Sequence, residues 1–343
     1  MLRLSTAICL TALPALPALA APPAVLTDIA PVHALVSRVM EGVGTPDLLL
    51  PPGASPHDFA LRPSDAARLS QAGLVIWVGH GLTPWLEEPL ETLAGGAVHL
   101  ELMAAPGWTP LPLREDANFA HGHEEEHDEH AEEAEHDEHD EHDEHAEEAE
   151  HDEHDEQAEH DEHDEHAEHD AAEGSDPHAW LDPAVAGIWL GVIAEALAEQ
   201  DTENAAIYRA NAAAGQAEYA VLKAEVTAQL APFAGRSFVV PHDAYQYFET
   251  AFSLPAAGAI SLSDAASPGP ARVAELRDRI AAEGIACVLT DPQTSADWTA
   301  VLREGGGART AMVDPDGGSQ GAGAALYPAL IRSMADALAD CLQ

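Results

Sequence analysis

The residues from His121 to Asp170 constrain the fold most, because they cannot contribute to a hydrophobic core. This fifty-residue tract contains 14 of the 20 histidines and 28 acidic residues, and it has no Lys, Arg or Pro. Its apolar residues are almost all alanines, which predicts a disordered loop over residues 115–175 rather than a domain. The folded part must therefore be built from the sequence on either side.

The side chains of the tract suit divalent metal ions, because imidazole and carboxylate groups are common ligands. The twelve residues that begin at His130 recur letter for letter from His145, which is typical of a segment that tolerates changes in length. We expect an auxiliary loop of weak metal sites with these ligands: His121, His123, His127, His130, His136, His139, His142, His145, His151, His154, His160, His163, His166 and His169. A solvated acidic spacer and a pH sensor remain alternatives.

The net charge of the rest of the chain also favours a cation as partner. Of 61 acidic residues 28 lie in the tract, so 33 remain against 14 Lys and Arg, a net charge of about −19. An acidic body does not attract nucleic acid or an anionic membrane surface.

The first twenty residues predict a cleaved signal peptide. Arg3 precedes an apolar run that ends in Ala18-Leu19-Ala20, the small residue pattern that signal peptidase accepts. No later stretch is apolar for long enough to span a membrane. We therefore expect an exported chain that begins at Ala21 and is not membrane-spanning.

Two cysteines, Cys287 and Cys341, remain after the predicted leader is removed. An even number of cysteines in an oxidising compartment favours a disulfide between the carboxyl-terminal helix and a strand over two buried thiols.

Apolar runs and helical spacing alternate on both sides of the tract. Before it we expect strands at 25–30, 47–50, 74–78 and 98–102, and helices at 32–41, 64–69 and 83–93. After it we expect strands at 237–240, 287–289 and 311–313, and helices at 183–199, 203–230, 244–251, 271–283, 295–303 and 325–342.

This alternation predicts the α/β class, with parallel sheets flanked by helices. We expect two similar lobes, residues 21–201 and 233–343, joined by one long rigid helix over 202–232. A metal site would then lie in the cleft between the lobes.

Three histidines outside the tract share a local context, since His57, His178 and His242 each follow a proline. Each Pro-His lies in a loop or at the end of an apolar run, where open α/β sheets place ligand sites. One such dipeptide alone is typical of a surface loop. Three of them, from distant segments, predict a zinc triad with a fourth position for a carboxylate or water. We interpret His33 and His99 as ordinary residues, and His80 as a surface residue or one that supports a ligand from behind.

Four stretches together resemble the periplasmic solute-binding proteins that deliver zinc or manganese to ABC importers, and among these the zinc-specific ZnuA-like members. They are Gly53-Ala-Ser-Pro-His-Asp-Phe with Arg62-Pro-Ser-Asp65, Asp176-Pro-His-Ala-Trp-Leu-Asp-Pro183, Pro241-His-Asp-Ala-Tyr-Gln-Tyr-Phe248 and Val313-Asp-Pro-Asp-Gly317. The resemblance covers nearly the whole mature chain, and such proteins carry a charged His-rich insertion where this tract lies.

The resemblance implies that His57, His178 and His242 bind Zn²⁺ and that Asp314 supplies a carboxylate as fourth ligand. It also implies the Cys287 to Cys341 disulfide. The implied protein is a monomeric periplasmic receptor, not an enzyme, that delivers zinc with high affinity to the membrane permease of an ABC importer. The tract would be an auxiliary zinc site or sensor.

Other functions remain open at this point. A zinc buffer or adhesin without a transporter needs the same ligands, whereas a manganese receptor would favour a carboxylate in place of His242. A zinc hydrolase would use the open coordination position, but no strongly placed general base accompanies the histidines. Asp58, Asp182 and Asp243 could each orient a ligand imidazole or cap a helix or turn.

Overall fold

The computed structural model describes residues 22–114, 116–119, 174–263, 268–304 and 307–343. The predicted signal peptide over residues 1–20 and the fourteen predicted ligands of the tract lie outside these ranges. Within them no helix is long and apolar enough to cross a membrane.

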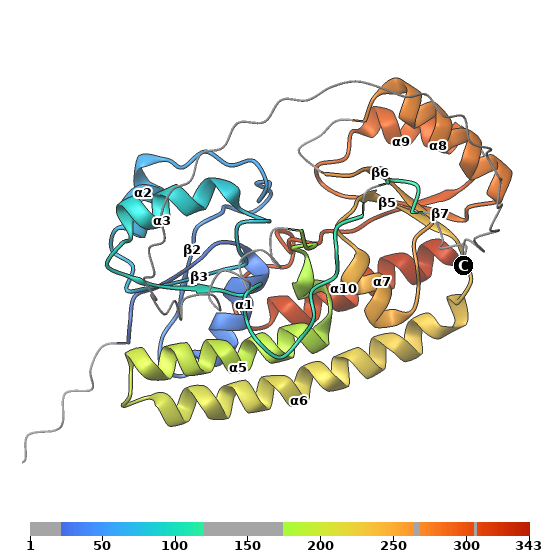
Figure 1. The fold of residues 1–343 in the computed structure, drawn as a ribbon. Coiled ribbons are helices and arrows are strands. Elements are labelled where there is room, and N and C mark those ends of the chain that lie inside the picture. Colours follow the sequence, from blue (N-terminus) through green and yellow to red (C-terminus); the bar gives the residue numbers. More distant parts are fainter. Residues whose placement is uncertain (1–21, 115, 120–173, 264–267, 305–306) are drawn as a thin grey trace, which may run out of the picture.

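The first sheet is parallel and has the strand order β2-β1-β3-β4 (Figure 1). Its strands are β1 (Val25–Thr27), β2 (Asp47–Leu48), β3 (Leu74–Trp77) and β4 (Val98–Glu101). The connections contain α1 (Ala30–Val39), α2 (Pro63–Leu69), the 3₁₀ turn η1 (Pro84–Leu86) and α3 (Glu87–Leu93). Prolines stand in the first turn of α1 and α2, where the missing N–H costs no helical hydrogen bond.

The second sheet repeats this topology with the order β6-β5-β7-β8, again parallel. Its strands are β5 (Phe238–His242), β6 (Gly258–Ser261), β7 (Cys287–Thr290) and β8 (Arg309–Met312). Its helices are α7 (Gln246–Phe252), α8 (Pro270–Glu283), α9 (Ala296–Glu304) and α10 (Leu326–Leu342). The predicted α/β class with two similar lobes is confirmed, although β6 was not among the predicted strands.

Alternate residues of the central strands face two different cores, as the two-residue period of a strand requires. In the first lobe Leu26, Val75 and Trp77 pack under α2 and α3. In the second lobe Val239 and Val288 pack under α8 and α9. The opposite faces of both sheets belong to a single apolar cluster that reaches from Val25 to Leu342.

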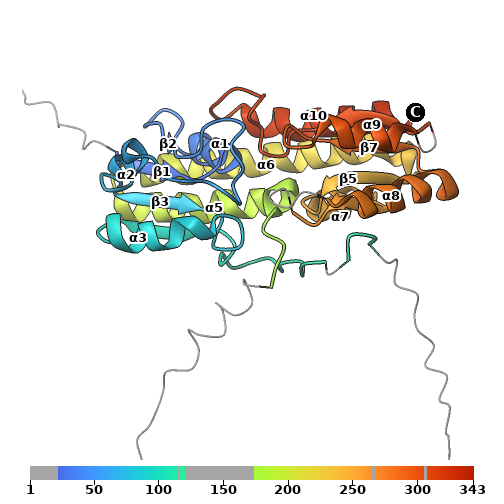
Figure 2. The same ribbon diagram turned by 90° about the horizontal axis from the view of Figure 1, so that it is seen from above.

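Two long helices run beneath the lobes in the view of Figure 1. After the 3₁₀ turn η2 (Ala179–Leu181) come α5 (Pro183–Gln200) and the 26-residue α6 (Ala205–Leu230), which pack together as a hairpin. The α6 helix runs under both lobes and ends at η3 (Ala231–Phe233), as Figures 1 and 2 show. The α10 helix packs against both α6 and α1, so it also joins the second lobe to the first.

A disulfide between Cys287 and Cys341 joins β7 to α10, with a Cα–Cα distance of 5.6 Å. The pairing expected from the sequence is therefore present. Because α10 also packs on the first lobe, the disulfide connects the second sheet to the shared core. Such a core opposes a wide hinge motion between the lobes.

Candidate metal centre

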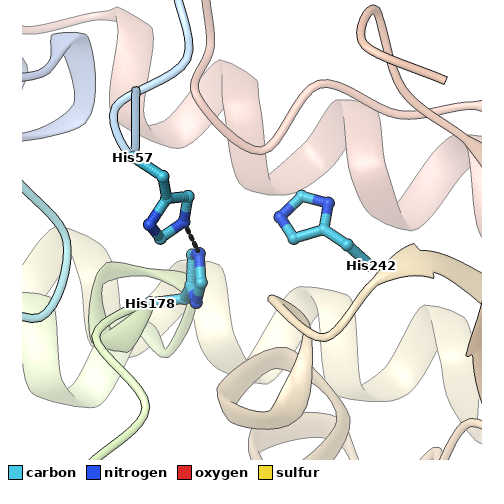
Figure 3. Close-up of side chains that lie close together, drawn as sticks. All are labelled: His57, His178 and His242. Carbon is cyan, nitrogen blue, oxygen red and sulfur yellow. Dashed lines mark hydrogen bonds between the residues drawn. The ribbon is translucent and has the colours of Figure 1, made fainter. Parts of the chain in front are cut away.

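The three Pro-His segments meet between the two sheets. One ring nitrogen from each of His57, His178 and His242 lies within 4.8 Å of the other two. Figure 3 shows the three rings facing a common point. Nε2 of His57 and Nε2 of His178 are 3.2 Å apart. Two nitrogens at about 2.0–2.1 Å from one tetrahedral zinc ion are about 3.3 Å apart, so this spacing fits shared ligation.

His57 lies in the loop that follows β2, and it is partly exposed. Its backbone N–H donates to Oγ of Ser55 over 3.2 Å. Nε1 of Trp85 donates to the carbonyl oxygen of Pro56 over 2.7 Å, and the Trp85 ring packs on Phe59 with centroids 5.2 Å apart. These contacts hold the loop in place both before and after His57 in the chain.

His178 immediately precedes η2 and is buried. One carboxylate oxygen of Asp176 accepts hydrogen bonds from the backbone N–H of His178 over 3.0 Å and from its Nδ1 over 2.7 Å. Nε1 of Trp180 donates to the carbonyl oxygen of Pro315, and the backbone carbonyl of Trp180 accepts from the Tyr327 hydroxyl. The second lobe therefore helps to hold the turn that carries His178.

His242 is the last residue of β5 and comes from the second lobe. Its Nδ1 donates to Oδ2 of Asp291 over 3.1 Å. The other oxygen of Asp291 accepts from the backbone N–H of Thr294 over 2.7 Å and from its hydroxyl over 2.6 Å. Burial raises the pKa of the Asp291 carboxyl, but the hydrogen bonds from His242 and Thr294 together bring that pKa below its ordinary value.

These two carboxylates determine which nitrogen can bind a metal. A carboxylate that accepts from Nδ1 keeps the proton on that atom and leaves the Nε2 lone pair for a metal ion. With Nδ1 bonded to a carboxylate, Nε2 is the atom through which His178 and His242 could each bind a metal ion. The sequence offered a local clue to Asp176, which lies two residues before His178 in the same motif. It offered none to Asp291, which lies 49 residues beyond His242.

Two of the three acids that the sequence left open have other partners, and the third is exposed. Asp182 caps α5 by accepting from the Ala184 N–H over 2.7 Å, and it pairs with Lys223. Asp243 pairs with Arg114 at 2.8 Å, and burial raises the pKa of its carboxyl to about 6 although Arg114 opposes the shift. Asp58 is exposed.

Asp314 lies outside the group of mutually close ligand atoms. Its Oδ2 accepts from the Ser319 N–H over 2.8 Å. The hydrogen bond from Trp180 to Pro315 nevertheless ties its loop to the turn beside His178. Its predicted role as fourth ligand stays a prediction.

The remaining described histidines lie elsewhere in the first lobe. A ring nitrogen of His33 is 3.1 Å from the Pro46 carbonyl oxygen, and one of His99 is 3.0 Å from that of Ala94. His80 pairs with Glu87 at the surface, with 2.7 Å between Nδ1 and Oε2. None of these three belongs to the group of mutually close ligand atoms found among the described residues.

Known proteins resemble the chain over most of its length. Residues 25–341 match the family described as "ZnuA: Zinc-uptake complex component A periplasmic". The "High-affinity zinc uptake system protein ZnuA" of Paracoccus denitrificans (strain Pd 1222) is 48% identical over 329 residues, which are 96% of this chain and 94% of the relative. The protein of the same name from Brucella abortus (strain 2308) is 43% identical over 93% of this chain and 91% of the relative.

Solved structures share the fold. A crystal structure of ZnuA superposes with a TM-score of 0.69 at 20% identity, covering 94% of this chain and 100% of the other. A zinc-bound ZnuA deletion mutant gives a TM-score of 0.68 at 20% identity, with 94% and 98% covered. The family match and the sequence identities show that the chain belongs to the ZnuA family of periplasmic zinc-uptake components.

Proposed function

We propose that this protein is a high-affinity receptor that captures zinc in the periplasm and delivers it to the membrane permease of an ABC importer. The carrying observation is the group of three ring nitrogens within 4.8 Å of one another, from His57, His178 and His242. Relatives at 43–48% identity named as high-affinity zinc uptake proteins support the same role.

The ligand chemistry favours zinc over manganese. Imidazole nitrogen suits zinc, whereas manganese prefers a larger share of carboxylate, carbonyl and water oxygen. Three imidazoles, two of them oriented by carboxylates, give a nitrogen-rich set. We assign the fourth position to Asp314, which would exchange its hydrogen bond from Ser319 for the metal.

A hydrolase is less well supported by the geometry. A zinc-bound water needs a nearby base that is free to take its proton. The two acids that bond to the triad, Asp176 and Asp291, already accept from imidazole Nδ1 atoms. The description of the matching family, a periplasmic zinc-uptake complex component, supports a receptor instead.

The remaining parts of the scheme extend this proposal. Residues 1–20 would direct export and be cleaved, and the mature protein would act as a monomer. Residues 21–201 and 233–343 would be the lobes, joined by 202–232. The acidic His-rich tract would hold several zinc ions weakly and act as a reservoir or sensor for the tight site.

Zinc titration tests the two-part scheme. We would titrate the mature protein and a variant lacking residues 122–170 by calorimetry, with manganese as the competing ion. We expect one tight zinc site in both proteins and several weak sites only in the full chain. Loss of the tight site together with the tract, or manganese bound as tightly as zinc, would contradict the proposal.

Transport separates the receptor from a zinc buffer or adhesin. In a bacterium whose own zinc receptor gene is deleted, the chain produced together with its partner permease should restore growth in zinc-depleted medium. His242→Ala should fail to restore it, while His99→Ala, a histidine outside the triad, should succeed. Tight zinc binding without restored growth would favour a buffer.

A further inference from the structure

A segment just before the tract crosses from the first lobe to the second. We call residues 111–114 and 116–119 the strap; Figure 1 shows it rising from the side of the first lobe toward β6 of the second. Its Leu111 N–H donates to the Tyr247 hydroxyl over 2.8 Å. Its Ala117 carbonyl accepts from the Ala259 N–H over 2.8 Å, so the strap pairs with the edge strand of the second sheet.

The beginning of the strap is bonded to the segment that carries His178. The carbonyl oxygen of Leu111 accepts from the Asp176 N–H over 2.8 Å, and Leu113 N–H donates to the Gly174 carbonyl over 3.0 Å. Asp176 in turn holds Nδ1 of His178. The position of the strap is therefore coupled to one of the three candidate ligands.

Arg114, in the middle of the strap, is bonded to the residue after another ligand. Its Nη1 donates to Oδ1 of Asp243 over 2.8 Å, and Asp243 directly follows His242. The guanidinium also makes a bidentate pair with Glu249, at 2.8 and 3.1 Å. It lies 3.9 Å from the centroid of the Phe119 ring.

The burial of these groups makes the contact specific. The side chains of Asp243 and Glu249 are 7% and 3% exposed, and that of Arg114 is 20% exposed. Two neighbouring buried carboxylates repel each other and are poorly solvated, so they depend on the guanidinium between them. A planar bidentate fork also fixes direction, which a single charge does not.

We propose that Arg114 is a positioning residue of the metal centre, which sets the spacing between His178 and His242 by tying the strap to Asp243. The identity of the metal rests on the zinc function proposed above. Three short links join the two ligands across the lobes: Asp176 to Leu111, the strap itself, and Arg114 to Asp243. Affinity depends on this spacing because all ligands must reach one ion at about 2.0–2.1 Å.

The first test compares two arginines of the same region. Arg114→Gln in the full chain should weaken tight zinc binding about tenfold, the lower end of the range for supporting groups. Arg272→Gln is the matched control. Arg272 bonds to strap residues Ala117 and Asn118, but none of the residues that it contacts here is next to a candidate ligand. It should leave zinc affinity unchanged. Equal losses in both variants would overturn the proposal.

A double-mutant cycle separates positioning from general destabilisation. If Arg114 acts through His242, the double variant Arg114→Gln with His242→Ala should bind zinc no more weakly than His242→Ala alone. A structural role would lower affinity in both backgrounds by the same factor. Independent, multiplying losses would therefore refute the inference.

Arg114→Lys serves if Arg114→Gln does not fold, because lysine keeps the charge but not the fork. It should give a smaller loss of zinc affinity and a changed visible spectrum when cobalt(II) is the probe. Affinity and spectrum equal to those of wild type would overturn the inference. Absence of any tight site in the wild-type protein would instead contradict the proposed function.

Discussion

The two lobes differ in the buried side chains at the ends of their two central strands, β1 and β3 in the first lobe and β5 and β7 in the second. In the first lobe the buried carboxylate of Asp28, after β1, accepts from the N–H groups of Ile29 and Val78 over 2.7 and 2.8 Å. In the second lobe His242, at the end of β5, donates to Asp291, after β7, over 3.1 Å. The two sheets have the same strand order, but a structural carboxylate lies near one strand end and the imidazole of a candidate metal ligand lies near the other. The topology places potential sites at the carboxyl ends of the strands, and the side chains at those ends determine whether a metal can bind.

The lobes also differ in how their strands are fastened to the core. The second sheet has the disulfide from β7 to α10, and the first sheet has none among the described residues. Replacing Cys287 and Cys341 together by Ser should lower the free energy of unfolding by about 2–4 kcal/mol, because the unfolded chain loses a closed loop. Urea unfolding with and without reductant measures it. If reductant lowered the free energy of unfolding of the wild-type protein to the value of the double variant, the loss would be assigned to the bond itself.

Removing a ligand tests the contribution of each lobe to the site. His178→Ala and His242→Ala should each weaken tight zinc binding at least about tenfold, because each removes one nitrogen from the metal. Calorimetric titration measures the change, with His33→Ala as a control from the first lobe. An unchanged affinity in His242→Ala would mean that the first lobe binds zinc without the second.

The two buried carboxylates at the strand ends offer the sharpest contrast. Asp291→Asn should weaken zinc binding about tenfold, because the amide is a poorer acceptor for Nδ1 of His242. Asp28→Asn should leave zinc affinity unchanged, since its partners are backbone N–H groups. Comparable zinc losses in both variants would show that the strand end of the first lobe also supports the metal site.

The pH dependence of stability should also distinguish Asp28 from Asp291, because the pKa values of the two carboxyls are shifted in opposite directions. Burial raises the pKa of its carboxyl from 3.8 to about 7, although backbone N–H groups oppose the shift. Between these values the folded protein keeps a proton that the unfolded chain has released, so Asp28 lowers stability as pH rises through that window, by at most about 1.4 kcal/mol per pH unit. Above it the cost is constant. Urea unfolding from pH 4 to 8 should show this fall relative to Asp28→Asn; parallel curves would contradict it.

Local patterns were enough to predict most elements but not those that depend on distant partners. The apolar run at 74–78 and the helical spacing at 203–230 predicted β3 and α6 to within two residues at each end. The strand β6 follows Pro255 and begins at Gly258, so its sequence is typical of a loop. It is a strand because β5 on one side and the strap beside it supply partners.

The candidate site shows the same limit. The Pro-His context identified all three imidazoles because each carries its signal locally. The pairing of Asp291 with His242 spans 49 residues, and that of Arg114 with Asp243 spans 129. A lone arginine beside an acidic tract has no periodicity or motif that predicts such a contact.

The packing of α10 also bears on the order in which the chain can fold. This helix, formed by the last residues, packs on α1 near the beginning, and the Tyr327 hydroxyl donates to the carbonyl of Trp180 beside His178. A chain made from its amino terminus cannot complete the core of the first lobe until these residues arrive, and contacts so distant in sequence form late. Late completion suits a protein that, as we propose, must cross a membrane before it folds. A chain that stops before Leu326 should therefore expose apolar surface in the first lobe as well as in the second.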